Sequence, residues 1–274
     1  MIVVFDVGNT ETTVGLFDGE TLREHWRLTT DVSRTADELA VLLHMLLHSR
    51  GVRANEITGS AVGSVVPPLT GPLSEACEQC FGRPPVVVDA RAALPITLDV
   101  DEPLTVGADR LINTLAASRL YARDTIVVDL GTATTYDCIT AAGVFLGGVI
   151  QPGVRTSAET LFRRTSKLPA TELVPPQRVI GRRTEECIRA GVVLGAADSI
   201  DGIVRRIKRE WPGGATPLVV ATGGLAETLR PFCNEFDRVE PFLTLIGLRL
   251  AYELLSARAR AGDGARGGER SAAS

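Results

Sequence analysis

The chain has 274 residues, 45% of them hydrophobic and 23% charged, which is the composition of a globular protein with a hydrophobic core. Its net charge of −4 argues against a protein that coats nucleic acid, and no apolar run approaches the roughly 18–20 residues that cross a bilayer. Five cysteines without a regular framework, and an N-terminus that starts in a strand rather than a signal peptide, predict a cytoplasmic location.

The first half of the chain predicts a mixed α/β layer. β-Branched runs that end in turn residues predict a first strand from Ile2 and further strands over residues 20–30, 57–62 and 85–89. One helix is expected after a capping box in which Ser33 or Thr35 precedes Glu38, and another at Pro67-Pro68.

The second half repeats this order. It predicts a helix from about residue 111, a hairpin near 126–135, strands over 144–150 and 217–221, and helices over 157–164, 185–210 and 243–257. The repetition predicts an internal duplication with a junction around residue 112. We therefore expect an N-terminal domain over 1–112, a C-terminal domain over 113–258, and a disordered tail over 259–274, which is rich in glycine, alanine and charge.

Two hairpins share one pattern, an apolar strand followed by Asp-x-Gly and threonines. The first is Asp6-Val7-Gly8-Asn9-Thr10 and the second is Asp129-Leu130-Gly131-Thr132. An aspartate at a strand end can hold Mg²⁺, and the glycine lets backbone N–H groups approach a phosphate. Either hairpin alone could be a plain turn. Because the pattern recurs, it favours a clamp around a metal-bound nucleoside triphosphate.

A carboxylate and a guanidinium stand together in Gly107-Ala108-Asp109-Arg110, where a helix is expected to begin. Asp109 could cap that helix, with Arg110 as a surface cation. Alternatively, Asp109 could be a general base and Arg110 could bind a substrate carboxylate. The residues themselves lean slightly toward the cap.

Two glycine-rich turns occur at residues 147–153 and 222–224. Each could have a purely structural role, or it could let the backbone approach a ligand closely. The P-loop and the Gly-x-Gly-x-x-Gly dinucleotide fingerprint do not occur in the sequence. Cys77 and Cys80 form a CxxC, and His44 and His48 are spaced one helical turn apart, but neither pair has the further ligands of a zinc site.

Taken together, these motifs resemble the type III pantothenate kinases of the acetate-kinase/sugar-kinase/Hsp70/actin superfamily. The resemblance covers Met1 to about Leu255 and rests on seven segments in order: 6–10, Ser64-Val65-Val66-Pro67-Pro68, 107–110, 129–135, 147–153, 221–224 and 237–245. It implies two duplicated ribonuclease-H-like (actin-like ATPase) domains, each a mixed sheet flanked by helices.

The resemblance also implies ATP-dependent phosphorylation of the primary hydroxyl of pantothenate, the first step toward coenzyme A. ATP would bind to Asp6, Val7, Gly8, Asn9, Thr10, Glu11, Thr12 and Thr13, and to Thr132. Asp6 would lie near Mg²⁺, through water, and Asp129 would bind a monovalent cation, potassium or ammonium. Pantothenate would contact Gly107, Ala108, Asp109, Arg110 and Thr184, with Asp109 as the general base. The resemblance further implies a homodimer whose substrate sites are completed near the subunit interface.

Two positions depart from the family pattern: Val100 stands where many members carry a tyrosine, and Arg183 stands where an asparagine is common. Both departures bear on the shape of the pantothenate pocket. A non-catalytic regulator with this fold and a sugar or acetate kinase are the competing functions. The intact phosphate loop argues against the regulator, and Gly-Ala-Asp-Arg argues against the other kinases.

Overall fold

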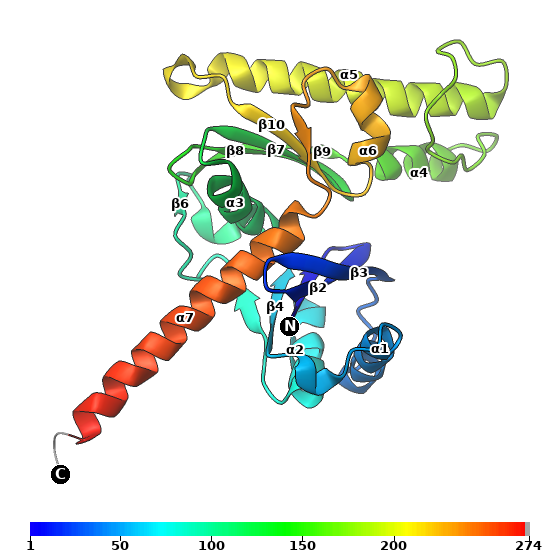
Figure 1. Ribbon diagram of the computed structural model, residues 1–274. Helices are drawn as coiled ribbons and strands as arrows, with labels where there is room; N and C mark the ends of the chain where they lie inside the picture. Colours follow the sequence, from blue (N-terminus) through cyan, green and yellow to red (C-terminus); the bar gives the residue numbers. More distant parts are fainter. Residues whose placement is uncertain (272–274) are drawn as a thin grey trace. The chain divides into compact units, whose positions relative to one another are not determined.

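The computed structural model describes residues 1–271, with the backbone alone described for residues 261–271. The chain forms two compact units (Figure 1). Unit 1 comprises Met1–Pro95, Asp101–Ala116 and the C-terminal segment from Thr244, and unit 2 comprises Ile96–Val100 and Ala117–Leu243. The border after Ala116 lies close to the expected junction. The C-terminal helix, expected with the second domain, instead belongs to unit 1.

Unit 1 is built on a mixed sheet of five strands in the order β3-β2-β1-β4-β5. The strands are β1 (Ile2–Val7), β2 (Glu11–Asp18), β3 (Thr21–Thr29), β4 (Gly59–Ser64) and β5 (Val86–Val88). β2 runs antiparallel to both of its neighbours, whereas β1, β4 and β5 are parallel. The carboxyl ends of β1 and β4 therefore meet at the same edge of the sheet.

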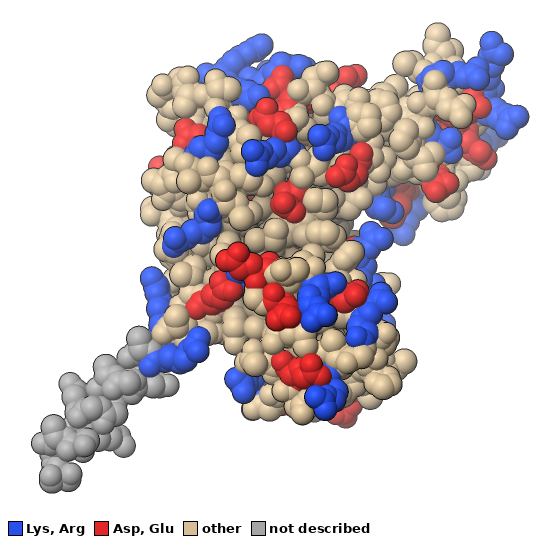
Figure 2. All heavy atoms as spheres, viewed as in Figure 1, with Lys and Arg blue, Asp and Glu red and all other residues tan. Residues whose placement is uncertain are grey.

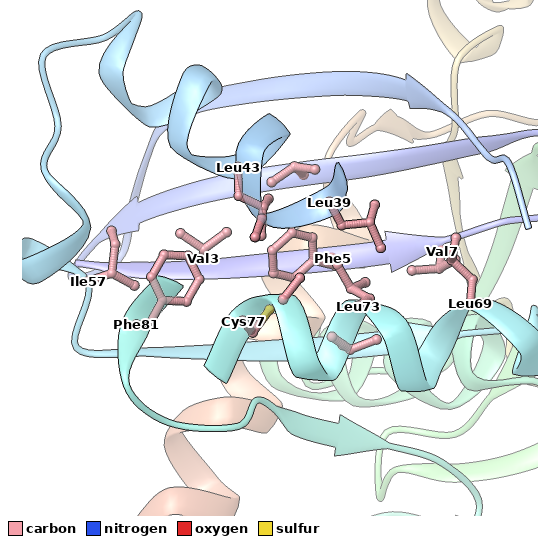
Figure 3. Packing of buried hydrophobic residues seen from close by; sticks show 14 of the residues in the cluster. Val3, Phe5, Val7, Leu39, Leu43, Ile57, Leu69, Leu73, Cys77 and Phe81 are labelled. Carbon is pink, nitrogen blue, oxygen red and sulfur yellow. The ribbon is translucent and has the colours of Figure 1, made fainter. Parts of the chain in front are cut away.

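Helices α1 (Ala36–His48) and α2 (Pro67–Phe81) cover one face of this sheet. The predicted capping box is present, because the Thr35 hydroxyl accepts from the Glu38 N–H and the Glu38 carboxylate accepts from the Thr35 N–H. Figure 3 shows the core that results, with Phe5 of β1 packed between Leu39 and Leu73. Burying a side chain of this size stabilises the fold by about 1.5–3 kcal/mol.

The other face of the sheet packs against α3 (Ala108–Tyr121) and α7 (Leu243–Ser271). Glycines make the close approach possible. A side chain on Gly63 would collide with Ile112 of α3, and one on Gly59 would collide with the Tyr252 ring of α7. The two short 3-10 turns of this unit are Ala54–Glu56 and Pro103–Thr105.

Unit 2 repeats the topology with a sheet in the order β11-β10-β7-β8-β9-β6. Its strands are β6 (Thr97–Leu98), β7 (Thr125–Leu130), β8 (Ala133–Ile139), β9 (Val144–Pro152), β10 (Leu218–Thr222) and β11 (Arg238–Val239). Strands β7 to β11 have the same mutual order and directions as β1 to β5, and β6 adds one parallel edge strand. The predicted duplication is therefore confirmed as a repeat of topology.

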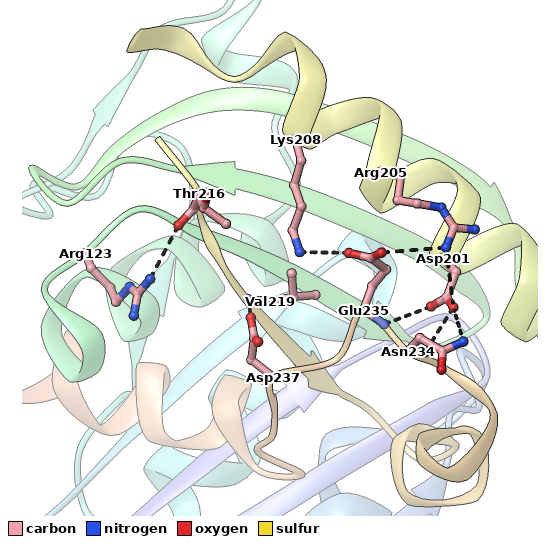
Figure 4. Close-up of polar contacts among 9 residues, drawn as sticks. All are labelled: Arg123, Asp201, Arg205, Lys208, Thr216, Val219, Asn234, Glu235 and Asp237. Carbon is pink, nitrogen blue, oxygen red and sulfur yellow. Dashed lines mark hydrogen bonds and ion pairs between the residues drawn. The ribbon is translucent and has the colours of Figure 1, made fainter. Parts of the chain in front are cut away.

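Helix α5 (Thr184–Glu210) packs on one face of the second sheet, beside the core of unit 2. Its Asp201 is 3% exposed, yet its carboxylate accepts hydrogen bonds from the backbone N–H groups of Asn234 and Glu235 at 3.0 and 3.1 Å (Figure 4). Lys208 pairs with Glu235 at 2.8 Å. These contacts fix the segment before β11 against α5 and satisfy a buried charge. The remaining helices of unit 2 are α4 (Val154–Arg164), α6 (Ala226–Leu229), and the 3-10 turns Pro212–Gly214 and Arg230–Phe232.

Helix α7 begins on a packed face of unit 1 and is assigned through Ser271, and residues 272–274 lie outside the described residues. Alanine and arginine, which make up residues 257–261, are strong helix formers. The expected disordered tail over 259–274 stays a prediction.

Candidate active site

The first Asp-x-Gly hairpin is formed by the end of β1 and the start of β2. Asp6 pairs with Thr13 across the strands, and Val7 pairs with Thr12. The Gly8 N–H closes the turn by donating to the Glu11 carbonyl at 3.1 Å. A Cβ on Gly8 would lie 2.9 Å from that carbonyl oxygen, so any side chain here would open the turn. Glycine is therefore required at position 8 by the geometry of the turn itself.

The polar groups of this turn differ in exposure. Asn9, Thr10 and Glu11 are exposed, Asp6 and Thr13 are half-buried, and Thr12 is only 6% exposed. An anion bound at this edge of the sheet would therefore contact the exposed residues Asn9, Thr10 and Glu11 and the half-buried residues Asp6 and Thr13. The predicted ATP residues from Asp6 to Thr13 thus lie on one continuous hairpin, in which Thr12 is buried, whereas Thr132 lies in unit 2.

Asp109 lies in the first turn of α3, which begins at Ala108. The carbonyl of Gly107 accepts from the Arg110 and Leu111 N–H groups, so Gly107 holds the position that opens the helix. Asp109 Oδ1 accepts from the Arg110 N–H at 2.9 Å. The interpretation of Asp109 as the helix cap is therefore not what the structure shows, because Asp109 follows the cap position.

The Asp109 carboxylate folds back over Gly107. A Cβ on Gly107 would lie 2.5 Å from Asp109 Oδ1 and 3.4 Å from Val65 Cγ1. The Val65 N–H in turn donates to the Val7 carbonyl at 3.0 Å. The structure therefore brings the Gly-Ala-Asp-Arg turn and the first hairpin to the same end of β1 and β4.

Burial raises the pKa of the Asp109 carboxyl above its usual range. The N–H and the guanidinium of Arg110 act in the opposite direction and lower this pKa in part. A carboxylate with a raised pKa holds a proton more readily than an exposed aspartate. This is the property expected of a general base.

The second hairpin lies in unit 2, where two glycine turns close around it. Gly223 has a left-handed backbone, with φ +89°, and a Cβ there would lie 2.8 Å from both Asp129 Oδ1 and Leu130 N. The Gly153 N–H donates to the Thr132 carbonyl at 3.1 Å, and a Cβ on Gly153 would lie 2.6 Å from the Gly131 carbonyl oxygen. Gly223 therefore packs on Asp129 itself, and Gly153 packs on the turn that follows Asp129, so both glycine-rich segments have a structural role around the second hairpin.

The two aspartates lie in different surroundings. Among the residues that the structure describes, no three His, Cys, Asp or Glu side chains gather as a metal cluster. Mg²⁺ takes one or two carboxylates and keeps several waters, which fits Asp6 at an accessible strand end. The Asp129 carboxylate lies beside Gly223 and Gly131, whereas the Thr132 carbonyl already accepts hydrogen bonds from the Gly153 N–H and the Thr156 hydroxyl.

Thr184 is exposed and is the first residue of α5. Further along this helix, the Ser199 hydroxyl donates to Gln151 Oε1 at 3.1 Å, near the end of β9. Residues 184 to 199 span about 22 Å of helix at about 1.5 Å per residue. Within unit 2, the structure therefore does not bring Thr184 to the Asp129 hairpin. Val100, which replaces the common tyrosine, lies 3.6 Å from the Cβ position of Gly147.

Thr30 is a residue at this site that the sequence interpretation missed. It follows β3, and its hydroxyl donates to the Gly8 carbonyl at 2.7 Å and lies 2.8 Å from the Thr12 hydroxyl. Its partners precede it by 22 and 18 residues, so no local spacing marks the contact. Only the pairing of β3 with β2 reveals it.

The sequence model of type III pantothenate kinases matches residues 2–206 of the chain. The chain belongs to the type III pantothenate kinase family. A family member from Roseiflexus castenholzii is 46% identical over 254 residues, which are 93% of this chain and 99% of that protein. One from Streptomyces avermitilis is 46% identical over 259 residues, covering 92% of this chain and 98% of its own length.

Solved structures with low identity to this chain show its fold alone. The activator of 2-hydroxyisocaproyl-CoA dehydratase from Clostridium difficile, with bound ADPNP, has a TM-score of 0.55 at 13% identity and covers 96% of this chain and 97% of its own. Component A of (R)-2-hydroxyglutaryl-CoA dehydratase from Acidaminococcus fermentans has a TM-score of 0.53 at 13% identity, covering 94% and 98%. The predicted fold class, two actin-like ATPase domains with mixed sheets, is confirmed.

Proposed function

We propose that this kinase transfers the γ-phosphoryl group of ATP to the primary hydroxyl of pantothenate, in coenzyme A biosynthesis, with Asp109 as general base. Membership of the type III pantothenate kinase family supports the reaction. One observation carries the assignment of residues. The Asp109 carboxylate lies on Gly107 beside Val65, whose N–H bonds the end of β1 where the predicted phosphate loop begins.

The reaction asks the protein for positioning and charge neutralisation more than for covalent chemistry. The turn from Asp6 to Thr13 holds the triphosphate, and Gly107 to Arg110 hold pantothenate, with the Arg110 guanidinium on its carboxylate. Asp109 accepts the proton of the hydroxyl as the new O–P bond forms. The bond from the γ-phosphorus to the β,γ-bridging oxygen breaks, and ADP leaves.

Asp6 is the residue that would hold Mg²⁺, through water, and Thr132 would contact ATP. A bound Mg²⁺ neutralises charge on the phosphate oxygens. Asp6 is half-buried at the end of β1 and pairs with Thr13, so strand pairing fixes its backbone position. The role of Asp6 itself is to hold a carboxylate at the start of the phosphate loop.

Replacing Asp109 with asparagine is expected to lower kcat by about 10²–10⁴-fold, because the hydroxyl proton loses its acceptor. In the wild type, kcat/KM should fall as pH drops through the pKa of Asp109, since only the carboxylate can accept a proton. Burial raises that pKa, so this acid limb should lie above the ordinary aspartate value of about 3.9. A coupled assay of ADP release between acid and neutral pH measures both effects.

Asp101→Asn is the matched control, because Asp101 is an exposed acid shortly before the same turn. It should keep the wild-type kcat and acid limb. Wild-type activity in Asp109→Asn, with an unchanged acid limb, would rule out Asp109 as the base.

The potassium or ammonium site proposed at Asp129 is supported by the recurrence of the Asp-x-Gly hairpin in unit 2, where Asp129 pairs with Thr135 as Asp6 pairs with Thr13. Exchanging potassium for sodium should lower the wild-type kcat about tenfold, which corresponds to about 1.4 kcal/mol of transition-state stabilisation. Asp129→Asn should be slow in both salts and lose the difference between them. Equal wild-type rates in both salts, at constant ionic strength, would contradict a cation at Asp129.

A homodimer would cover apolar side chains on what we call the arm, residues 154–190 of unit 2. These side chains are Leu161, Phe162, Val179 and Ile180, exposed by 38% to 84%. Figure 2 shows basic side chains, with acidic ones among them, at the end of the arm. The exposed basic residues of the arm include Arg163, Arg164, Lys167, Arg178, Arg182 and Arg183. Thr184 lies on this arm. Thr184 would contact pantothenate if the arm of one copy completed the substrate site of the second copy.

Phe162→Asp should shift the protein from dimer to monomer, because it places a charge in the apolar part of the arm. Light scattering after gel filtration distinguishes the 29.2 kDa chain from twice that mass. Met45→Asp on α1, an apolar residue outside the arm that is more exposed than Phe162, should leave the dimer intact. A wild type that is monomeric at working concentration, or a Phe162→Asp dimer, would contradict the interface.

None of the helices in the described part of the chain is long and apolar enough to span a membrane. We further propose a cytoplasmic location, supported by five cysteines that are all free thiols. Cell fractionation would contradict this if the protein were recovered with membranes or outside the cell.

A further inference from the structure

We propose that Thr30 is a positioning residue that holds the phosphate loop in its binding geometry, and that Thr12 serves this scaffold rather than the phosphates. The inference rests on the proposed function, in which the turn from Asp6 to Thr13 binds ATP. It goes beyond that function by separating the residues of the turn that bind ATP from the residues that only maintain its conformation. Thr30 itself lies outside the turn, directly after β3.

Thr30 bonds to three successive points of the loop. Its hydroxyl donates to the Gly8 carbonyl at 2.7 Å and lies 2.8 Å from the Thr12 hydroxyl. Its backbone N–H donates to the Thr10 carbonyl at 3.1 Å. One residue therefore ties the beginning, the middle and the end of the turn to the end of β3.

The direction of the bond between the two hydroxyls follows from counting protons. A hydroxyl has a single hydrogen, and that of Thr30 is used at the Gly8 carbonyl. The Thr12 hydroxyl must therefore be the donor in its bond to Thr30. Phosphate oxygens of ATP accept hydrogen bonds, so the Thr12 side chain has no proton left for them. With 6% exposure, Thr12 is also poorly placed to reach a ligand.

The pantothenate segment is held by a different contact. Gly107 and Asp109 lie beside Val65, whose N–H bonds to Val7, and Thr30 takes no part in that bond. Loss of the Thr30 hydroxyl should therefore loosen the nucleotide site and leave the alcohol site unchanged. A general loss of stability would instead affect both sites.

The first test compares Thr30→Val, Thr30→Ser and the control Thr29→Val in the kinase assay. Valine keeps the β-branched shape and removes the hydroxyl, so the KM for ATP should rise about tenfold (~1.4 kcal/mol) with the KM for pantothenate unchanged. Thr30→Ser keeps the hydroxyl and should restore the wild-type KM. Thr29 is the exposed neighbour on β3, and Thr29→Val should match the wild type.

The second test is a double-mutant cycle on nucleotide affinity, measured by calorimetry with MgADP. Thr12→Val and Thr30→Val break the same bond, so their effects should be strongly non-additive in the double variant. Additive effects, with the larger loss from Thr12→Val, would make Thr12 a direct ligand and overturn the inference. Nucleotide affinity of Thr30→Val equal to that of the wild type would also overturn it.

The binding measurement separates this inference from the proposed function. If the wild type binds MgADP but does not phosphorylate pantothenate, the proposed function is wrong. The double-mutant cycle on MgADP affinity would still test whether Thr30 positions the phosphate loop. Should Thr30→Val prove unstable, Thr12→Val removes the shared bond while the Thr30 bond to Gly8 remains. That variant must then show a loss of affinity, or the inference is wrong.

Discussion

The hydrogen bond from the Val65 N–H to the Val7 carbonyl is the contact on which the arrangement of unit 1 depends. It continues the parallel pairing of β1 with β4 past the ends of both strands. On one side of this bond lies the hairpin that begins at Asp6, and on the other lies Gly107, with the Asp109 carboxylate folded over it. Phosphate loop and candidate base thus share an edge because two parallel strands end together.

The duplication gives two sheets of the same order but two different aspartate environments. Asp6 lies one residue before the end of β1, beside an exposed turn, whereas the Asp129 carboxylate packs against Gly223. The same Asp-x-Gly pattern therefore stands in two different surroundings, because the neighbouring segments differ. This difference is consistent with the two roles that we propose for Asp6 and Asp129.

Features with local causes could be predicted from the sequence, and features that depend on distant contacts could not. The capping box at Thr35 and the repeated strand order follow from short-range patterns. Strands β6 and β11 have only two residues each and carry no periodic signal. The bonds of Thr30 need the β2–β3 pairing before they can be seen.

We propose that Asp109 faces the reacting hydroxyl while the turn after Asp6 holds the nucleotide. A crystal structure with pantothenate and a non-hydrolysable ATP analogue tests it most directly. The account predicts an Asp109 carboxylate oxygen about 2.6–3.2 Å from the primary hydroxyl of pantothenate. A complex in which both ligands are bound, but another side chain contacts that hydroxyl and Asp109 points away from it, would contradict the account.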